Sequence, residues 1–79
     1  MEIHYSKQAI KFLKKLDKTT KQRIVTAIRK IPYGDIKKMQ GYTKDIYRLR
    51  VGDYRIIFNK QGQICYIEKI DNRGQVYKK

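Results

Sequence analysis

Residues 46–59 of the chain are IYRLRVGDYRIIFN. Apolar and polar side chains alternate before and after Gly52 and Asp53, a pattern typical of strands that bury one face. A Gly-Asp pair between two such runs predicts a β-hairpin closed by a two-residue turn, which fixes the register of the strands. The expected pairs are Val51 with Tyr54, Arg50 with Arg55, Leu49 with Ile56, Arg48 with Ile57 and Tyr47 with Phe58.

This register separates the two faces of the hairpin. One face carries apolar and aromatic side chains, and the other carries Arg48, Arg50 and Arg55. Like charges that lie opposite each other destabilise a strand pair by roughly 0.2–1 kcal/mol, and here Arg50 faces Arg55. Two explanations stay open: a solvated face on which long side chains spread apart, or an anion site whose rigid guanidinium groups match a phosphate.

Two helices are predicted between residues 6 and 31. Ser6 is a suitable N-cap for the first, and a capping box of Thr19 and Gln22 is expected to begin the second, which Pro32 ends. The connection between them is short, so we expect an antiparallel helical hairpin that lies against a sheet. Its apolar stripes are Ala9, Phe12, Leu13 and Leu16, then Ile24, Ala27, Ile28 and Ile31.

The remaining segments complete an α+β pattern. Residues 1–5 predict a first strand, 33–45 a loop, and 63–70 a last strand that 71–74 interrupts. We therefore expect one domain over residues 1–79, in which an N-terminal strand and a helical hairpin precede an antiparallel sheet of three to four strands.

The composition is dominated by positive charge. Lys plus Arg number 20 and Asp plus Glu number 7, so the formal net charge is +13. Such an excess favours a nucleic-acid backbone, an anionic membrane or an acidic protein as partner, with a merely solubilising surface as the bland alternative. The single cysteine, Cys65, cannot form an intramolecular disulfide. Without a predicted signal peptide or membrane span, we expect a cytoplasmic protein that does not associate with membranes.

Three motifs carry a resemblance to a known family. The segment YRLRVGDYRIIF at 47–58, Gly41 upstream, and IDNRGQVY at 70–77 resemble the hairpin and C-terminal motif of the RelE/ParE toxins, and of the RelE branch most closely. The resemblance covers nearly the whole chain. It implies a lysine-rich helical hairpin on a small antiparallel sheet, and a toxin of a type II toxin-antitoxin system.

The resemblance also implies an activity and partners. RelE-like members cleave messenger RNA in the ribosomal A site, with the ribose 2′-hydroxyl as nucleophile and without a metal or other cofactor, and a small acidic antitoxin neutralises them. Carried over motif by motif, it gives phosphate or transition-state roles to Arg48, Arg50, Arg55 and Arg73, and makes Tyr77 the tyrosine that orients or stacks on a base. RNA binding is expected from Arg48, Arg50, Lys69 and Lys78.

The general base is not assigned by the resemblance. RNA cleavage of this kind needs a base, an acid and cations, and arginine is always protonated, so it supplies only the last. The best-known RelE enzymes have lysines where this chain has Arg48 and Arg50. Candidate bases are Glu68, Lys69, Asp71 and His4, and the ribosome could also contribute groups.

Two other functions stay open. One is inhibition of DNA gyrase by a ParE-like toxin on the same fold. The other is a non-catalytic RNA-binding relative that has kept the fold and lost the base.

Overall fold

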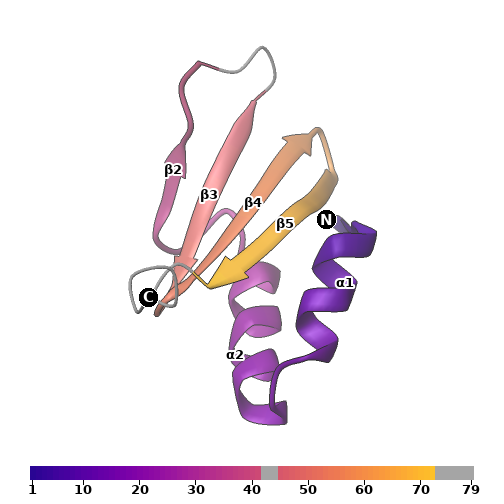
Figure 1. Cartoon of the computed structure of the whole chain (residues 1–79). Helices are drawn as coiled ribbons and strands as arrows, with labels where there is room; N and C mark the ends of the chain where they lie inside the picture. The colour runs from indigo at the N-terminus through magenta and orange to yellow at the C-terminus, as the bar shows by residue number, and fades with distance from the viewer. Residues whose placement is uncertain (42–44, 73–79) are drawn as a thin grey trace.

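A computed structural model describes residues 1–41 and 45–72 of the chain. Its elements are β1 Glu2–Tyr5, α1 Lys7–Lys14, α2 Lys18–Arg29, β2 Ile36–Lys38, β3 Ile46–Val51, β4 Tyr54–Gln61 and β5 Ile64–Asn72. The strands form one sheet in the order β1-β5-β4-β3-β2, beside which the two helices lie (Figure 1). The predicted α+β class and order of elements are confirmed. Neither of these helices has the length and hydropathy that crossing a membrane requires.

The β3–β4 hairpin has the predicted register. Arg50 pairs with Arg55 and Val51 with Tyr54. Gly52 has a φ of +60°, a left-handed conformation that glycine adopts at little cost in such a turn. All five predicted pairs are present, so the arginines and the apolar side chains lie on opposite faces.

The core lies between the helices and the inner face of the sheet. The predicted stripes face this core: Ala9, Leu13, Ile24, Ile28 and Ile31 are buried, and Phe12, Leu16 and Ala27 are partly buried against them. The sheet contributes its own set of buried side chains, namely Leu49, Ile56, Phe58, Cys65, Ile67 and Ile70. The inner face of the hairpin is also ordered by a stacked pair of rings, Tyr47 and Phe58, with centroids 5.5 Å apart.

The helix N-termini differ in one respect from prediction. Ser6 is the N-cap of α1, and its Oγ accepts a hydrogen bond from the Ala9 N–H at 3.1 Å. The capping box at Thr19 is wrong, because Asp17 caps α2 and accepts hydrogen bonds from the Thr20 N–H and hydroxyl at 3.1 and 2.6 Å. A carboxylate is a stronger acceptor than a hydroxyl at the positive end of a helix. These hydrogen bonds lower the pKa of the Asp17 carboxyl.

The segment predicted as a loop contains a strand. Residues Ile36–Lys38 form β2, which pairs antiparallel with β3 and places Ile36 opposite Leu49. Sequence reasoning missed it because a three-residue edge strand has no alternation to detect; its pairing depends on the exposed edge of β3. At the end of this segment, an ion pair of 3.1 Å with Asp45 raises the pKa of Lys38.

Strand β5 also differs from prediction, in its length and in its pairing with β1. It continues through Asp71 and Asn72, where a break was expected, because Arg55 and Tyr54 at the start of β4 supply partners for them. On its other edge β1 pairs with it in parallel, so the sheet is mixed. The helical hairpin is the crossover that a parallel pair requires.

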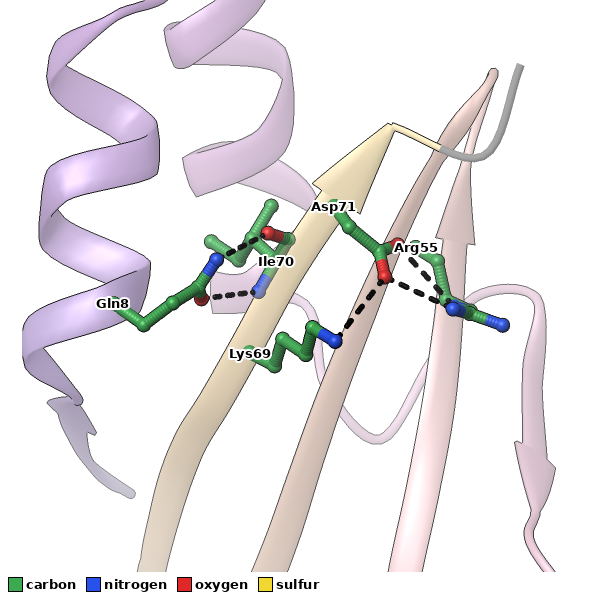
Figure 2. A network of polar contacts seen from close by, with 5 residues as sticks. All are labelled: Gln8, Arg55, Lys69, Ile70 and Asp71. Carbon is green, nitrogen blue, oxygen red and sulfur yellow. Dashed lines mark hydrogen bonds and ion pairs between the residues drawn. The ribbon is translucent and has the colours of Figure 1, made fainter. Parts of the chain in front are cut away.

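Beyond the end of β1, two side chains at the start of α1 bind the backbone of β5. Ser6 Oγ donates to the Glu68 carbonyl at 2.7 Å. The Gln8 side-chain amide donates to the Ile70 carbonyl and accepts from the Ile70 N–H, both at 3.0 Å (Figure 2). Gln8 thus pairs with the backbone N–H and C=O of Ile70 as a neighbouring strand would. This holds in place the segment of β5 that carries Lys69 and Asp71.

We predict that Cys65 is unreactive in the folded protein. Its side chain is fully buried, and burial raises the pKa of the thiol, so the reactive thiolate is disfavoured. Labelling with Ellman's reagent at neutral pH should be slower than in denaturant by about a hundredfold or more, since ~2.8 kcal/mol of opening free energy gives that factor. Rapid stoichiometric labelling in native buffer would contradict the burial of this residue.

Candidate nucleic-acid interface

The face of the sheet opposite the helices carries the predicted arginines. We call it the outer face. Its side chains alternate along each strand with the side chains that pack into the core. In register, one row is Lys37, Arg48, Ile57 and Lys69, and a second row is Arg50, Arg55 and Asp71. A third row holds Asn59, Tyr66 and His4. The structure therefore brings the three arginines together on one face, as the sequence predicted, and adds Lys69 to it.

Arg48 lies at the centre of the outer face and is largely buried. Its side chain is 18% exposed, and its guanidinium lies 4.0 Å from the Asp35 carboxylate. Its Nε is buried and has no hydrogen-bond partner within residues 1–41 and 45–72. A buried donor without an acceptor costs about 1–3 kcal/mol, so the packing of β3 between β2 and β4 holds Arg48 in place with its donors incompletely satisfied.

Arg55 is held by a carboxylate. Its Nη2 and Nε donate to the two oxygens of Asp71 at 2.9 and 3.3 Å. Lys69 Nζ approaches the same carboxylate to 4.0 Å, so Asp71 lies between two cations (Figure 2). This negative charge offsets the repulsion between Arg50 and Arg55 that the hairpin register imposes.

Arg50 differs from its two neighbours. Its side chain is exposed, and its backbone N–H donates to the Asp35 carbonyl at 3.0 Å. Among the residues that the structure describes, its guanidinium makes no hydrogen bond or ion pair. Arg50 is therefore the arginine of the outer face best placed to meet an anion from solution.

The candidate bases are not equally placed. Glu68 accepts a short hydrogen bond from the Asn59 amide, and Asp71 is engaged with Arg55. His4 pairs with Glu2 on the edge strand β1, three strand spacings or about 14 Å from β3. Lys69 lies on the outer face beside Asp71. Only His4 is thus separated from the arginines.

Tyr66 is a feature of the outer face that sequence reasoning missed. It is 39% exposed and lies in register with Asn59 and His4. Among the described strands it is the one tyrosine whose ring is on the outer face. An exposed aromatic ring on a face that also carries cations can stack on nucleotide bases. Its position between the apolar residues Cys65 and Ile67 was the signal available in the sequence.

Most of the excess charge lies on the helices. Residues 7–30 carry nine exposed cations and one acid, Asp17. On the outer face, by contrast, Arg48 and Arg55 each have an acidic neighbour. Beside α2 and the end of β3 is a groove of about 560 Å³, lined by Lys18, Thr19, Gln22, Arg23, Thr26, Ala27, Lys30 and Val51.

Three predicted site residues, Arg73, Tyr77 and Lys78, lie outside the described residues, and their roles stay predictions. The described residues also contain no cluster of three His, Cys, Asp or Glu side chains suited to holding a metal ion.

Comparison with known proteins places this fold. A family profile described as "ParE toxin of type II toxin-antitoxin system, parDE" matches residues 3–77. A chain of the archaeal RelE-RelB complex from Pyrococcus horikoshii OT3 is similar in structure with a TM-score of 0.75 and 30% identity, over 94% of this chain and 96% of that one. A chain of the RelB-RelE antitoxin-toxin complex from Methanococcus jannaschii gives 0.74 and 28%, over 94% of each chain.

A more distant structure and the curated sequences add less. The YoeB dimer from Staphylococcus aureus gives a TM-score of 0.70 at 19% identity, over 87% of this chain and 92% of that one, and shows the shared fold alone. No curated protein matches the sequence significantly. The profile match over residues 3–77, together with a 30% identical structure of the same fold, shows that the chain belongs to the RelE/ParE superfamily of type II toxin-antitoxin toxins.

Proposed function

We propose that the protein is a RelE-type toxin that cleaves messenger RNA in the ribosomal A site and so inhibits translation. The observation that carries the proposal is the arginine cluster on a rigid sheet. Arg50 is exposed and its guanidinium makes no hydrogen bond or ion pair within the described residues, and Arg48 has a buried Nε that lacks an acceptor there. Together they provide forked donors whose geometry matches a phosphate group.

The chemistry follows from these groups. In the proposed reaction the ribose 2′-oxygen attacks the adjacent phosphorus, its proton passes to a base, and the bond to the 5′-oxygen breaks as that oxygen gains a proton. The phosphorane between these steps carries two negative charges, which preorganised cations stabilise. We assign this stabilisation to Arg48, Arg50, Arg55 and Arg73, and the orientation of a base to Tyr77, with Lys69 and Lys78 as RNA-binding residues.

The contacts of the two carboxylates narrow the choice of general base. Glu68 and Asp71 each already accept hydrogen bonds from neighbours on the outer face. Asp71 cannot take a proton from a ribose without giving up Arg55, whereas Glu68 has a second oxygen outside its hydrogen bond to Asn59. We infer that proton transfer depends on Glu68 or Lys69, on the C-terminal segment, or on groups that the ribosome supplies.

The charge on the helices supports the same proposal. The nine cations of residues 7–30 are exposed on the helical layer, which packs on the inner face of the sheet. A protein that binds one RNA strand needs a single basic face, whereas a protein enclosed by ribosomal RNA meets phosphates on both sides. Ribosomes are cytoplasmic, and we place the toxin there.

The ParE profile keeps DNA gyrase inhibition as the second candidate function. Both candidates imply a small acidic antitoxin, because the similar structures from Pyrococcus horikoshii and Methanococcus jannaschii are complexes of RelE with RelB. Mapping of messenger RNA after induction separates the candidates. Cuts inside translated regions, in phase with codons, support the ribonuclease; intact messages together with blocked supercoiling would replace it by the gyrase inhibitor.

We predict that Arg50→Ala impairs cleavage more than it impairs ribosome binding. Loss of a donor to the developing charge should lower the single-turnover rate on programmed ribosomes by about a hundredfold or more. Lys38→Ala is the matched control, because it removes one cation from the same sheet at a residue paired with the inward-facing Tyr47. Equal cleavage rates for the two variants would show that Arg50 is not part of the catalytic site.

We predict that the cations of the helices contribute to ribosome binding and not to the cleavage step. Lys7, Lys18 and Lys21 lie in the first turns of α1 and α2, where a positive charge does not stabilise a helix. The triple Lys→Gln variant should therefore stay folded, bind ribosomes more weakly and flatten the log-log salt dependence by up to about 2, at about 0.7 per phosphate. Its cleavage rate at saturation should be unchanged, and unaltered binding would contradict the two-sided contact.

We predict that the cognate antitoxin raises the melting temperature. A partner that binds only the folded toxin adds about 2.7 kcal/mol of stability at a hundred times its Kd. For a chain of this size that is a shift of roughly 10–20 °C. Differential scanning fluorimetry of toxin and complex measures it, and an unchanged melt at saturating antitoxin would exclude this mode of neutralisation.

A further inference from the structure

We propose that the Asp71 carboxylate occupies, within the free protein, an anion site formed by Arg55 and Lys69, and that an RNA phosphate replaces it on binding. The inference rests on the proposed function in naming RNA as the source of that phosphate. The site itself, an exchangeable anion site on the outer face, does not depend on that function.

The contacts define the site. Asp71 accepts from Arg55 through both carboxylate oxygens, at 2.9 and 3.3 Å, and lies 4.0 Å from Lys69 Nζ (Figure 2). A phosphate diester also presents two charged oxygens to a guanidinium fork, and the same two donors bind either group. The carboxylate therefore stands in the place that an external phosphate would take.

The position of Asp71 makes the exchange possible. It lies directly opposite Arg55 in the β4–β5 register, in the row that also contains Arg50. The side chains of Arg55 and Asp71 are 33% and 26% exposed, so solvent and ligand can reach the pair. The pair is bidentate and only partly exposed, so a phosphate must replace both hydrogen bonds to Arg55 in order to displace the carboxylate.

The exchange has a consequence for affinity. In the free toxin Asp71 neutralises part of the arginine row, so an isolated RNA strand must compete with an internal anion. The carboxylate thereby lowers affinity for RNA in general. A phosphate that the ribosome positions accurately is favoured over one that diffuses freely.

The first test uses inorganic phosphate and no RNA. Asp71→Asn should bind phosphate ~5-fold more tightly than the parent, because the competing charge is gone. The readout is the rise in melting temperature on replacing chloride by phosphate at constant ionic strength. Asp53→Asn is the matched control: it removes the same charge in the hairpin turn, and no hydrogen bond or ion pair of its side chain is seen within the described residues.

A double variant connects the gain to Arg55. If Asp71 competes for the Arg55 fork, the added phosphate stabilisation of Asp71→Asn should disappear in Asp71→Asn/Arg55→Gln. Asp71→Ser, which removes the carboxylate without adding an amide, should show the gain as well. The proposal is overturned if neither Asp71 variant exceeds Asp53→Asn, or if the gain persists without Arg55.

The second test asks whether RNA is the external ligand. Asp71→Asn should steepen the log-log salt dependence of single-stranded RNA binding by about 0.7, one additional phosphate contact, relative to Asp53→Asn. A flatter slope would show instead that Asp71 positions Arg55, and would overturn the exchange. Phosphate exchange in the first test, with no RNA binding by any variant, would leave the anion site standing and overturn RNA as its external ligand.

Discussion

The two-residue turn at Gly52 and Asp53 is the constraint on which the rest of this structure depends. It aligns β3 with β4 so that Leu49 and Ile56 face the helices while Arg50 and Arg55 face outward. A slip of one residue would exchange the two faces, burying the arginines and exposing the core. The hydrophobic energy that holds the helices on the sheet thus also fixes the side on which the cations lie.

That constraint places two arginines opposite each other, and β5 resolves the conflict. Asp71 meets Arg55 across the β4–β5 ladder because β5 runs on past β1, where Gln8 supplies the missing partner to its backbone. A register shift beside Ile57 changes the alignment along this ladder and leaves Ile70 in the core. The polar network of Figure 2 is therefore both part of the fold and part of the candidate site.

An outer face dominated by arginine suits one chemical task well. Guanidinium groups stabilise a phosphorane and cannot accept a proton, so the arginines supply electrostatic stabilisation and leave proton transfer to other groups. The larger charge excess lies on the helices, away from the arginines. The functional proposal therefore assigns the chemistry to the sheet and the general attraction to RNA to the helices.

The sequence by itself determined the hairpin register, both helices, the buried stripes and the face that carries Arg48, Arg50 and Arg55. These features follow from local periodicity and turn chemistry, which act between residues close in the chain. It also carried the motifs by which the family was identified.

Tertiary structure alone decided the remainder. Several features depend on segments that are distant in sequence. They are the edge strand β2, the parallel pairing of β1, the contact of Asp71 with Arg55, the distance of His4 from the arginines and the outward ring of Tyr66. No local pattern encodes which strand edge is left unpaired or which acidic side chain lies opposite which basic side chain. The physical reason is that hydrogen-bonding edges and ion pairs are satisfied by whichever partner the packed core brings near.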